Sequence, residues 1–453
     1  MKTNITFVNG VGEVTGSNFL VESNEMKILV DCGLVQGVSF AEKENRVPFA
    51  YDPGSIDFLL VTHAHIDHIG RIPKLVKDGF QGKIYSTYAT KEISEEMFKD
   101  ALKILQMEGR KNGLPDLYQK EDIAKALSLW RGVSYHEEVL LKEGFSFYLK
   151  DAGHILGSAM IEIRRGDRKI VFTGDLGNSP APLLKDTESV TDADYLVMES
   201  VYGDRNHETK VERDRRFSQI IRDTIKGGGT VVIPVFSLER AQNILYSLNN
   251  LIEDGHIISV PVFLDSPLAI AITEIYRKQS KNFGAKIQQE IKEGDDIFDF
   301  PKLSFTITNE ESDEIHHVKG PKIILAGSGM SSGGRVSKHE KDFLPDSKNT
   351  VLLVGYQSLG TLGRNIENGA KSVRINGEEI PVRARIENIR GFSSHKDSDA
   401  LIDFAAGTKD KVKKVFVVMG EPKASLFLVQ RLRDYADLPA IYPKRGAPYE
   451  IEI

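Results

Sequence analysis

The sequence predicts an α/β protein in which one α/β module is inserted into another. Three observations predict this fold class: short β-rich runs open the chain, strands alternate with helices from about residue 205, and the style of the first part returns near residue 372. Apolar strands that alternate with helices are typical of parallel α/β units. We therefore expect a first part over 1–205, an inserted part over 206–371 and a closing part over 372–453.

The first part begins with short strands and continues with two helices. Breaks that contain Gly, Asn and Ser separate the first strands, as in hairpins or a meander. Two longer stretches carry Leu, Ile and Met at helical spacing, which is ordinary core patterning. The expected strands are 5–8, 18–22, 27–31, 57–62, 145–150, 159–164 and 168–174, and the expected helices are 91–112 and 119–131.

The inserted part alternates strands and helices and ends in a loop rich in Gly and Ser. The closing part has one clear strand, in the run KKVFVVMGE, followed by a helix. The expected strands of the inserted part are 229–235, 260–265 and 322–327, and the expected helices of both parts are 238–253, 267–282 and 423–435.

The composition excludes several classes of protein. With 40% hydrophobic and 27% charged residues, the 453-residue chain is globular, neither disordered nor collagen-like. A single cysteine, Cys32, excludes an intrachain disulfide and fits a reducing compartment. The sequence has no apolar run of membrane-spanning length and no basic, then apolar leader at its start. We therefore expect a cytoplasmic protein with no membrane partner.

The net charge of −6 gives no overall basic footprint of the kind that DNA-coating proteins show. A nucleic acid would have to meet a local basic patch, or bound metal ions that offset nearby carboxylates.

The strongest chemical signal is the run HAHIDH, which follows the strand expected at 57–62. His63 and His65 alternate in an extended segment and therefore share a side. Asp67 and His68 are adjacent and diverge, which suits two metal ions better than one. Imidazole and carboxylate are natural zinc ligands. The alternative is a surface cluster of polar residues, which this spacing does not favour.

Further ligands should follow other strands, because four residues cannot close two metal sites. His154 and Asp175 each come just after a strand-like run and beside a glycine, which allows close backbone approach. A carboxylate such as Asp175 can bridge two cations. Asp31 also ends a strand. It is either a turn residue or a carboxylate that orients a ligand histidine. Cys32 is expected to be a small buried residue.

These motifs, taken together, resemble the metallo-β-lactamase superfamily, and the later ones resemble its β-CASP branch of RNA-processing nucleases. The resemblance covers nearly the whole chain, and is nearest to prokaryotic ribonucleases similar to the endonuclease subunit of the cleavage and polyadenylation specificity factor. The motifs are HAHIDH at 63–68, GH at 153–154, TGD at 173–175, ESVYGD at 199–204, LDSP at 264–267, GSGMSSGGRV at 327–336, GTLGR at 360–364 and GFSSHKD at 391–397.

The resemblance implies a metallo-β-lactamase αββα sandwich with an inserted α/β β-CASP domain, and two bound zinc ions. The implied ligands of the first ion are His63, His65 and His154, and those of the second are Asp67, His68 and His395. Asp175 bridges both ions in this scheme, and Asp31 orients a ligand. The ligand types also suit manganese.

The resemblance further implies a ribonuclease of RNA processing or decay, either an endonuclease or an exonuclease, that acts on single-stranded RNA. Zinc-activated hydroxide would leave a 5′-phosphate and a 3′-hydroxyl. In addition to the ligands Asp67 and Asp175, Glu199 and His339 carry catalytic roles: family precedent places them in contact, with His339 protonating the leaving oxygen. A homodimer is compatible with the resemblance.

The loop at 327–336 can offer backbone N–H groups and hydroxyls to phosphate. The expected phosphate contacts are Ser331, Ser332, Gly333, Gly334, Arg335 and Arg364. The alternative for this loop is a tight turn packed on the sheet. Segment 364–396 is locally basic, and either RNA contact or an ordinary solvated face explains it.

Two other functions remain as alternatives. One is a small-molecule hydrolase of the same fold, of the thioesterase or lactonase class, which has no need of the inserted module or of His339 and His395. The other is a non-catalytic RNA-binding scaffold. The presence of every expected type of metal ligand argues against it. Two positions depart from the family pattern: Val201 stands where Thr is usual, and Met419 where His is common, which puts a substrate contact near Met419 in doubt.

Overall fold

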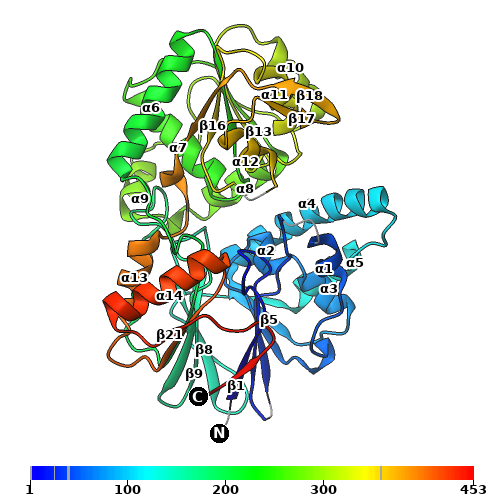
Figure 1. The fold of residues 1–453 in the computed structure, drawn as a ribbon, viewed down its shortest axis with the longest axis vertical. Helices are drawn as coiled ribbons and strands as arrows, with labels where there is room; N and C mark the ends of the chain where they lie inside the picture. The colour runs from blue at the N-terminus through cyan, green and yellow to red at the C-terminus, as the bar shows by residue number, and fades with distance from the viewer. Residues whose placement is uncertain (1–2, 25, 38–40, 358–359) are drawn as a thin grey trace. The chain divides into compact units, whose positions relative to one another are not determined.

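The computed structural model describes residues 3–24, 26–37, 41–357 and 360–453 (Figure 1). The chain divides into two compact units: unit 1 holds residues 1–206 and 395–453, and unit 2 holds residues 207–394. Segment 372–394, which we expected in the closing part, lies in unit 2 because its strand β19 (Arg385–Asn388) pairs in parallel with β16 (Thr350–Leu353) of the inserted sheet.

Unit 1 contains two mixed seven-stranded sheets among its described residues. The first has the strand order β22 (Pro448–Ile451), β1 (Thr3–Asn9), β2 (Asn18–Glu22), β3 (Lys27–Val30), β4 (Phe58–Leu60), β5 (Lys83–Thr87) and β6 (Trp130–Val133). The second has the order β21 (Ala440–Ile441), β20 (Lys414–Val417), β11 (Tyr195–Met198), β10 (Arg168–Phe172), β9 (Ala159–Arg165), β8 (Phe145–Asp151) and β7 (Val139–Leu140).

The two sheets pack face to face and helices cover their outer faces. Phe7 and Phe19 of the first sheet share one buried core with Phe147 and Phe172 of the second. A further core lies under helices on the outer face of the first sheet, and another under α13 and α14 on the second (Figure 1). The helices of unit 1 are α1 (Ala41–Arg46), η1 (Pro53–Ser55), α2 (Ile66–Ile69), α3 (Ile72–Lys77), α4 (Tyr88–Asn112), α5 (Lys120–Leu129), α13 (Ser398–Ala406) and α14 (Pro422–Ala436). This arrangement confirms the αββα sandwich.

Unit 2 is built on a sheet in which every strand pair is parallel. Its order is β14 (Leu303–Phe305), β13 (Val262–Asp265), β15 (Lys322–Ala326), β12 (Thr230–Pro234), β16 and β19. A hairpin of β17 (Ser372–Ile375) and β18 (Glu378–Pro381) packs with α11 and α12 on one face. The helices are α6 (Lys210–Lys226), α7 (Arg240–Glu253), α8 (Pro267–Lys278), η2 (Ser280–Asn282), α9 (Ala285–Lys292), α10 (Asn309–Glu314), η3 (Ile315–His317), α11 (Val336–Phe343), α12 (Leu362–Glu367) and η4 (Arg390–Phe392).

The pairing of the first strands differs in part from the expected meander. Strands β1, β2 and β3 pair antiparallel, as expected, but β3 and β4 pair in parallel. The carboxyl ends of β3 and β4 therefore lie at the same edge of the sheet, which brings the residues that follow them together. In the described part of the chain, no helix has the length and apolar content needed to cross a bilayer.

Candidate metal centre

The expected ligands of unit 1 all follow strand ends. His63 and His65 lie in the segment between β4 and α2, and Asp67 and His68 lie in the single turn of α2. His154 follows β8 and Asp175 follows β10. Because β8 and β9 form a hairpin beside β10, the loops after β8 and β10 open toward the same edge of the second sheet.

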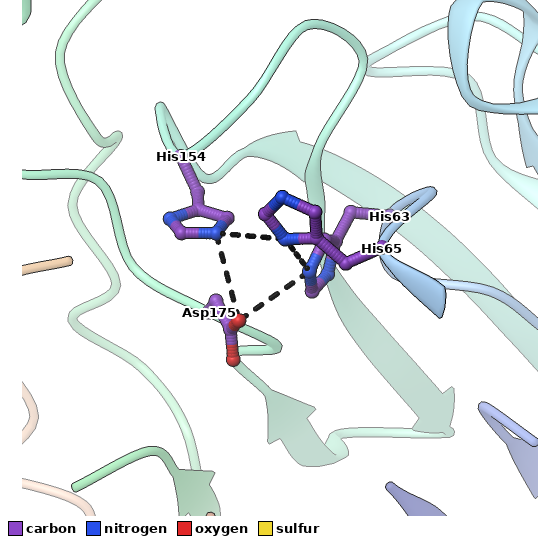
Figure 2. A group of neighbouring side chains, drawn as sticks. All are labelled: His63, His65, His154 and Asp175. Carbon is purple, nitrogen blue, oxygen red and sulfur yellow. Dashed lines mark hydrogen bonds and ion pairs between the residues drawn. The ribbon is translucent and has the colours of Figure 1, made fainter. Parts of the chain in front are cut away.

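Three imidazoles and one carboxylate converge from these loops (Figure 2). His65 Nδ1 lies 3.1 Å from His63 Nε2 and 3.3 Å from His154 Nε2. Asp175 Oδ2 lies 3.4 Å from His63 Nε2 and 3.5 Å from His154 Nε2. Each residue thus directs one potential ligand atom at a common point.

These spacings fit a tetrahedral zinc ion. Ligand atoms at 2.0–2.1 Å from a tetrahedral ion lie about 3.3–3.4 Å from one another. Four of the six separations, at 3.1, 3.3, 3.4 and 3.5 Å, cluster at that value, and all six are within 4.8 Å. The donor set of three histidines and a carboxylate is also one that zinc prefers.

Glycines let the ligand loops approach one another. Gly153 and Gly174 have φ of +65° and +54°, in the left-handed region that favours glycine. A Cβ on Gly174 would lie 2.7 Å from the Thr62 Cβ, and one on Gly153 would lie 2.8 Å from the Lys185 carbonyl oxygen. The glycines beside His154 and Asp175 are therefore required by the packing of the site.

A second group of donors lies on the other side of Asp175. His68 Nε2 is 3.5 Å from Asp175 Oδ1 and 3.9 Å from Asp67 Oδ2. In the described part of the chain, His68 Nε2 and Asp175 Oδ1 are buried without a hydrogen-bond partner. Unsatisfied buried polar atoms are costly, so two of them facing each other fit a further cation between them.

Asp31 contacts this second group directly. Its Oδ2 lies 2.7 Å from His68 Nδ1 and accepts hydrogen bonds from the Thr62 and Ser17 hydroxyls at 2.8 and 3.1 Å. Its Oδ1 accepts the Thr62 backbone N–H at 2.8 Å. With its Nδ1 held in this way, His68 presents Nε2 to Asp175. Of the two interpretations of Asp31, a turn residue or a carboxylate that orients a histidine, this geometry favours the second.

His395 lies next to Glu199. Its Nδ1 is 3.1 Å from Glu199 Oε1 and 4.0 Å from Asp175 Oδ2. The Glu199 carboxylate also accepts the backbone N–H of Leu176 at 2.7 Å and that of Val201 at 3.3 Å. Asp175, Glu199 and His395 form a second compact group of potential ligands. We had not anticipated the pairing of Glu199 with His395, since 196 positions separate them.

The electrostatics favour neutral imidazoles at His65 and His154 and an ionised carboxylate at Asp175. Burial, together with the neighbouring histidines, lowers the pKa of His65 and of His154 well below the usual value. Burial acts to raise the pKa of Asp175, but His68 and His63 outweigh it and hold that pKa well below its usual range. Metal ligands must be deprotonated, so His65, His154 and Asp175 are already in the state that binds a cation. Burial acts to lower the pKa of His68, but the carboxylates of Asp175, Asp31 and Asp67 outweigh it and raise that pKa well above its usual value. A cation bound at His68 would therefore displace a proton.

Burial would also lower the pKa of His395, but here the outcome differs from that at His65 and His154. The Glu199 carboxylate outweighs burial and raises the pKa of His395 to about 8. Burial also raises the pKa of Asp67.

His339, the residue expected to protonate the leaving oxygen, lies in unit 2. Its side chain is fully buried, and its Nε2 is 2.7 Å from Asp265 Oδ2. The hydrogen bonds described for the Glu199 carboxylate go instead to residues of unit 1. The role of His339 as proton donor stays a prediction, and the structure gives its ring a different partner.

The expected phosphate-contacting residues divide into exposed and engaged groups. Ser332, Gly333 and Gly334 are exposed at the tip of their loop. Ser331 is buried and donates to Glu340, and Arg335 donates to Asp265 at 2.7 Å. Arg364 lies 3.8 Å from Glu367 and against the Tyr356 ring.

Met419 belongs to the core between the two sheets of unit 1 and is 2% exposed. It borders a cavity of about 10 Å³ whose wall includes Asp31, His68 and Glu199. Met419 therefore forms an apolar wall of this cavity, and the substrate contact that its position put in doubt is not made by its buried side chain.

Sequence models of three families match the chain. The metallo-beta-lactamase superfamily matches residues 11–209, the Beta-Casp domain residues 241–366, and the Zn-dependent metallo-hydrolase RNA specificity domain residues 379–443.

Several curated proteins are similar over most of their length. Ribonuclease TTHA0252 from Thermus thermophilus is 37% identical over 92% of this chain and 93% of its own. The RNase J-like protein from Methanocaldococcus jannaschii is 32% identical over 98% of both chains. Transcription termination factor FttA from Pyrococcus horikoshii is 32% identical over 94% of this chain and 67% of its own.

Among solved structures, a protein of unknown function from Enterococcus faecalis V583 aligns over 100% of both chains with a TM-score of 0.55. At 14% sequence identity this likeness shows the fold alone.

Proposed function

We propose that this chain, which belongs to the metallo-beta-lactamase superfamily and carries Beta-Casp and Zn-dependent metallo-hydrolase RNA specificity domains, is a zinc-dependent ribonuclease. The observation that carries the proposal is the convergence of His63, His65, His154 and Asp175, whose potential ligand atoms all lie within 4.8 Å of one another. The RNA specificity domain and the similarity to a ribonuclease along nearly its whole length support RNA as the substrate.

We assign two metal sites to this centre. His63, His65 and His154 would hold the first ion, and His68 and Asp67 would hold the second. Asp175 would serve both, because its Oδ2 faces His63 and His154, whereas its Oδ1 faces His68. When bound, such a pair of ions supplies a water of lowered pKa and charge that stabilises the phosphate in the transition state.

Hydrogen bonds within the chain orient the ligands of the second site. Asp31 fixes the tautomer of His68 by occupying its Nδ1, and Thr62 holds the Asp31 carboxylate in place. Buried carboxylates that face one another repel without a cation between them, so Asp67 and Asp175 together favour a divalent ion.

The leaving 3′-oxygen needs a proton, and we assign the donor role to His395. Glu199 holds the ring of His395 by its Nδ1, within 4.0 Å of Asp175 and therefore at the metal centre. A histidine beside a buried carboxylate is a suitable general acid. We had expected His395 to be a ligand of the second ion and His339 to be the acid, and the contact with Glu199 favours the exchange of these roles.

Hydrolysis by this route leaves a 5′-phosphate and a 3′-hydroxyl, because water rather than the ribose 2′-hydroxyl attacks the phosphorus. End-group analysis of products from a 5′-labelled single-stranded RNA, with metal analysis of the same preparation, tests the proposal. Nitrocefin and a thioester in parallel reactions serve as small-molecule controls. Products that end in a 2′,3′-cyclic phosphate, or cleavage of the small molecules alone, would overturn it.

A further inference from the structure

Unit 2 has a buried polar cluster of its own, at the carboxyl end of β13. Its centre is Asp265, whose side chain is 0% exposed. Asp265 Oδ1 accepts from the Thr306 hydroxyl and from Arg335 Nη1, both at 2.7 Å. Its Oδ2 accepts from the Ser312 hydroxyl and pairs with His339 Nε2, both at 2.7 Å. Each carboxylate oxygen therefore has two partners.

Arg335 connects this cluster to the glycine- and serine-rich loop after β15. Besides Asp265, its guanidinium donates to the carbonyl oxygens of Thr306 and Ile307 at 2.9 and 2.6 Å. The Asn309 side-chain oxygen is a fourth acceptor at 3.4 Å, and a planar guanidinium held by four acceptors is fixed in orientation. Because Arg335 immediately follows Gly334, its anchoring also fixes the end of the loop.

Other contacts hold the rest of the loop. The backbone N–H of Val336 donates to the Gly327 carbonyl at 2.8 Å, and the Gln357 amide donates to the Gly329 carbonyl at 3.0 Å. Ser331 donates to the buried Glu340. Ser332, Gly333 and Gly334 are left exposed between these anchors, so the loop presents a short tip on a fixed base.

His339 belongs to the base of this loop. Its ring is 0% exposed and stacks on His316, with ring centroids 5.1 Å apart and an interplanar angle of 16°. A ring enclosed in this way has no open face for a substrate, and its Nε2 is already engaged by Asp265. Any effect of His339 on the reaction must pass through the residues that it holds.

We infer that His339 is a positioning residue, which holds Asp265 so that Arg335 and the loop tip at 332–334 are fixed for contact with the RNA backbone. The inference rests on the proposed function for its substrate, but the geometry that it describes lies wholly within unit 2. An exposed tip of one serine and two glycines on a rigid base suits phosphate oxygens, and the Ser332 hydroxyl, 3.3 Å from the Met330 carbonyl oxygen, can turn to such an acceptor.

The test compares His339→Ala with His339→Gln in the full-length, metal-loaded protein. His339→Ala should raise the KM for single-stranded RNA about tenfold and leave kcat within about twofold, because ground-state and transition-state binding are lost together. The amide of His339→Gln can donate to Asp265 from nearly the same position and should restore most of the KM. Lys341→Ala, a partly exposed change on the same helix, is the matched control and should leave both constants unchanged.

Hydrogen exchange of the amides at 328–335 gives a readout that does not depend on catalysis. Exchange should be faster in His339→Ala than in the wild type and close to wild type in His339→Gln. If His339→Ala does not fold, Ser312→Ala removes a different hydrogen bond to Asp265 and should change exchange and KM in the same direction, by less.

Two outcomes overturn the inference. One is a fall in kcat of a hundredfold or more at constant KM, which would make His339 the proton donor. The other is unchanged exchange of the loop amides in both His339→Ala and Ser312→Ala. A wild-type protein that does not cleave RNA would remove the proposed function, whereas the exchange data would still decide whether His339 positions the loop.

Discussion

The two units each bury a polar cluster at the carboxyl ends of their strands, yet the clusters differ in how their atoms are matched. Around Asp265 in unit 2, hydroxyls, a guanidinium and an imidazole face one carboxylate, so each acceptor has donors. In unit 1, the nitrogens of His63, His65 and His154 face one another and Asp175.

This difference separates a scaffold from a metal centre. Both Asp175 and Asp265 have a lowered pKa despite burial, that of Asp265 being about 2. Burial and pKa alone therefore do not distinguish them. What distinguishes them is the carboxylate itself. Asp175 Oδ1 has no hydrogen bond in the described structure and faces His68 Nε2, which has none either, whereas both oxygens of Asp265 are matched by donors, although His339 Nδ1 beside it has no partner.

Substitution of Asp175 should produce the largest effect. Asp175→Ala removes the carboxylate shared by both proposed metal sites, so zinc content should fall and activity should drop at least about a thousandfold, the value of several kcal/mol of lost charge stabilisation. Metal analysis and RNA cleavage rates measure this, with the exposed Asp410→Ala as control. An Asp175→Ala protein that keeps its full zinc content would show that Asp175 does not bridge two ions.

Substitution of His395 distinguishes a proton donor from a ligand. As the donor, His395→Ala should keep its zinc and lose about 10²–10⁴-fold in kcat, the usual contribution of general acid catalysis. Glu199→Gln should follow the same pattern to a smaller extent, because an amide still holds the ring but lacks the charge. If His395→Ala loses one zinc ion per chain, His395 is a ligand, as the resemblance implied.

Removal of metal should affect unit 1 alone. A ligand present at a thousandfold excess over its Kd stabilises the folded state by about 4 kcal/mol. Chelation should therefore increase hydrogen exchange in the segment 61–70 and after β10, while β13 and β15 of unit 2 keep their protection. Equal loss of protection in both units would mean that the ions do not act at the proposed site.

The sequence was sufficient for those parts of the site that depend on local order. His63 and His65 follow a strand at alternating positions, and His154 and Asp175 each follow a strand beside a glycine, so each signal lies within a few residues. The αββα sandwich followed from the resemblance that these motifs carry. Strands β5 and β6 were not predicted, and the helix expected at 119–131 extended over the first two residues of β6, which begins at Trp130.

Other features depend on contacts between distant segments and could not be read from local patterns. The partner of Glu199 is set by the return of the chain at residue 395, next to Gly177, with which His395 forms an isolated bridge. The burial of His339 depends on how α11 packs, and its sequence, VSKHEKDF, is mostly polar. The placement of β19 also depends on a distant contact, its pairing with β16 of unit 2. The locally basic segment around β19 gave no sign of this pairing.

The smallest expected effect concerns Glu340, whose carboxyl accepts from Ser331 at the base of the loop in unit 2. Burial raises its pKa to about 7. Because this pKa is higher in the folded than in the unfolded state, the stability associated with protonated Glu340 is complete at acidic pH and is lost as the pH rises through about 7. Asp265, with a lowered pKa, has the opposite sign: its contribution is lost only as the pH falls toward about 2.

Glu340→Gln keeps an acceptor for Ser331 and removes the charge. It should therefore stabilise the protein by about 2–3 kcal/mol near pH 8 and by almost nothing near pH 4. Urea unfolding of the wild type and the variant at the two pH values measures the difference, and Glu310→Gln, an exposed carboxylate in the same unit, is the control. An equal change at both pH values would mean that Glu340 is ionised throughout. The loop base in unit 2 would then contain an unsatisfied charge, as unit 1 does in the absence of metal, and the contrast between the two clusters would be one of degree.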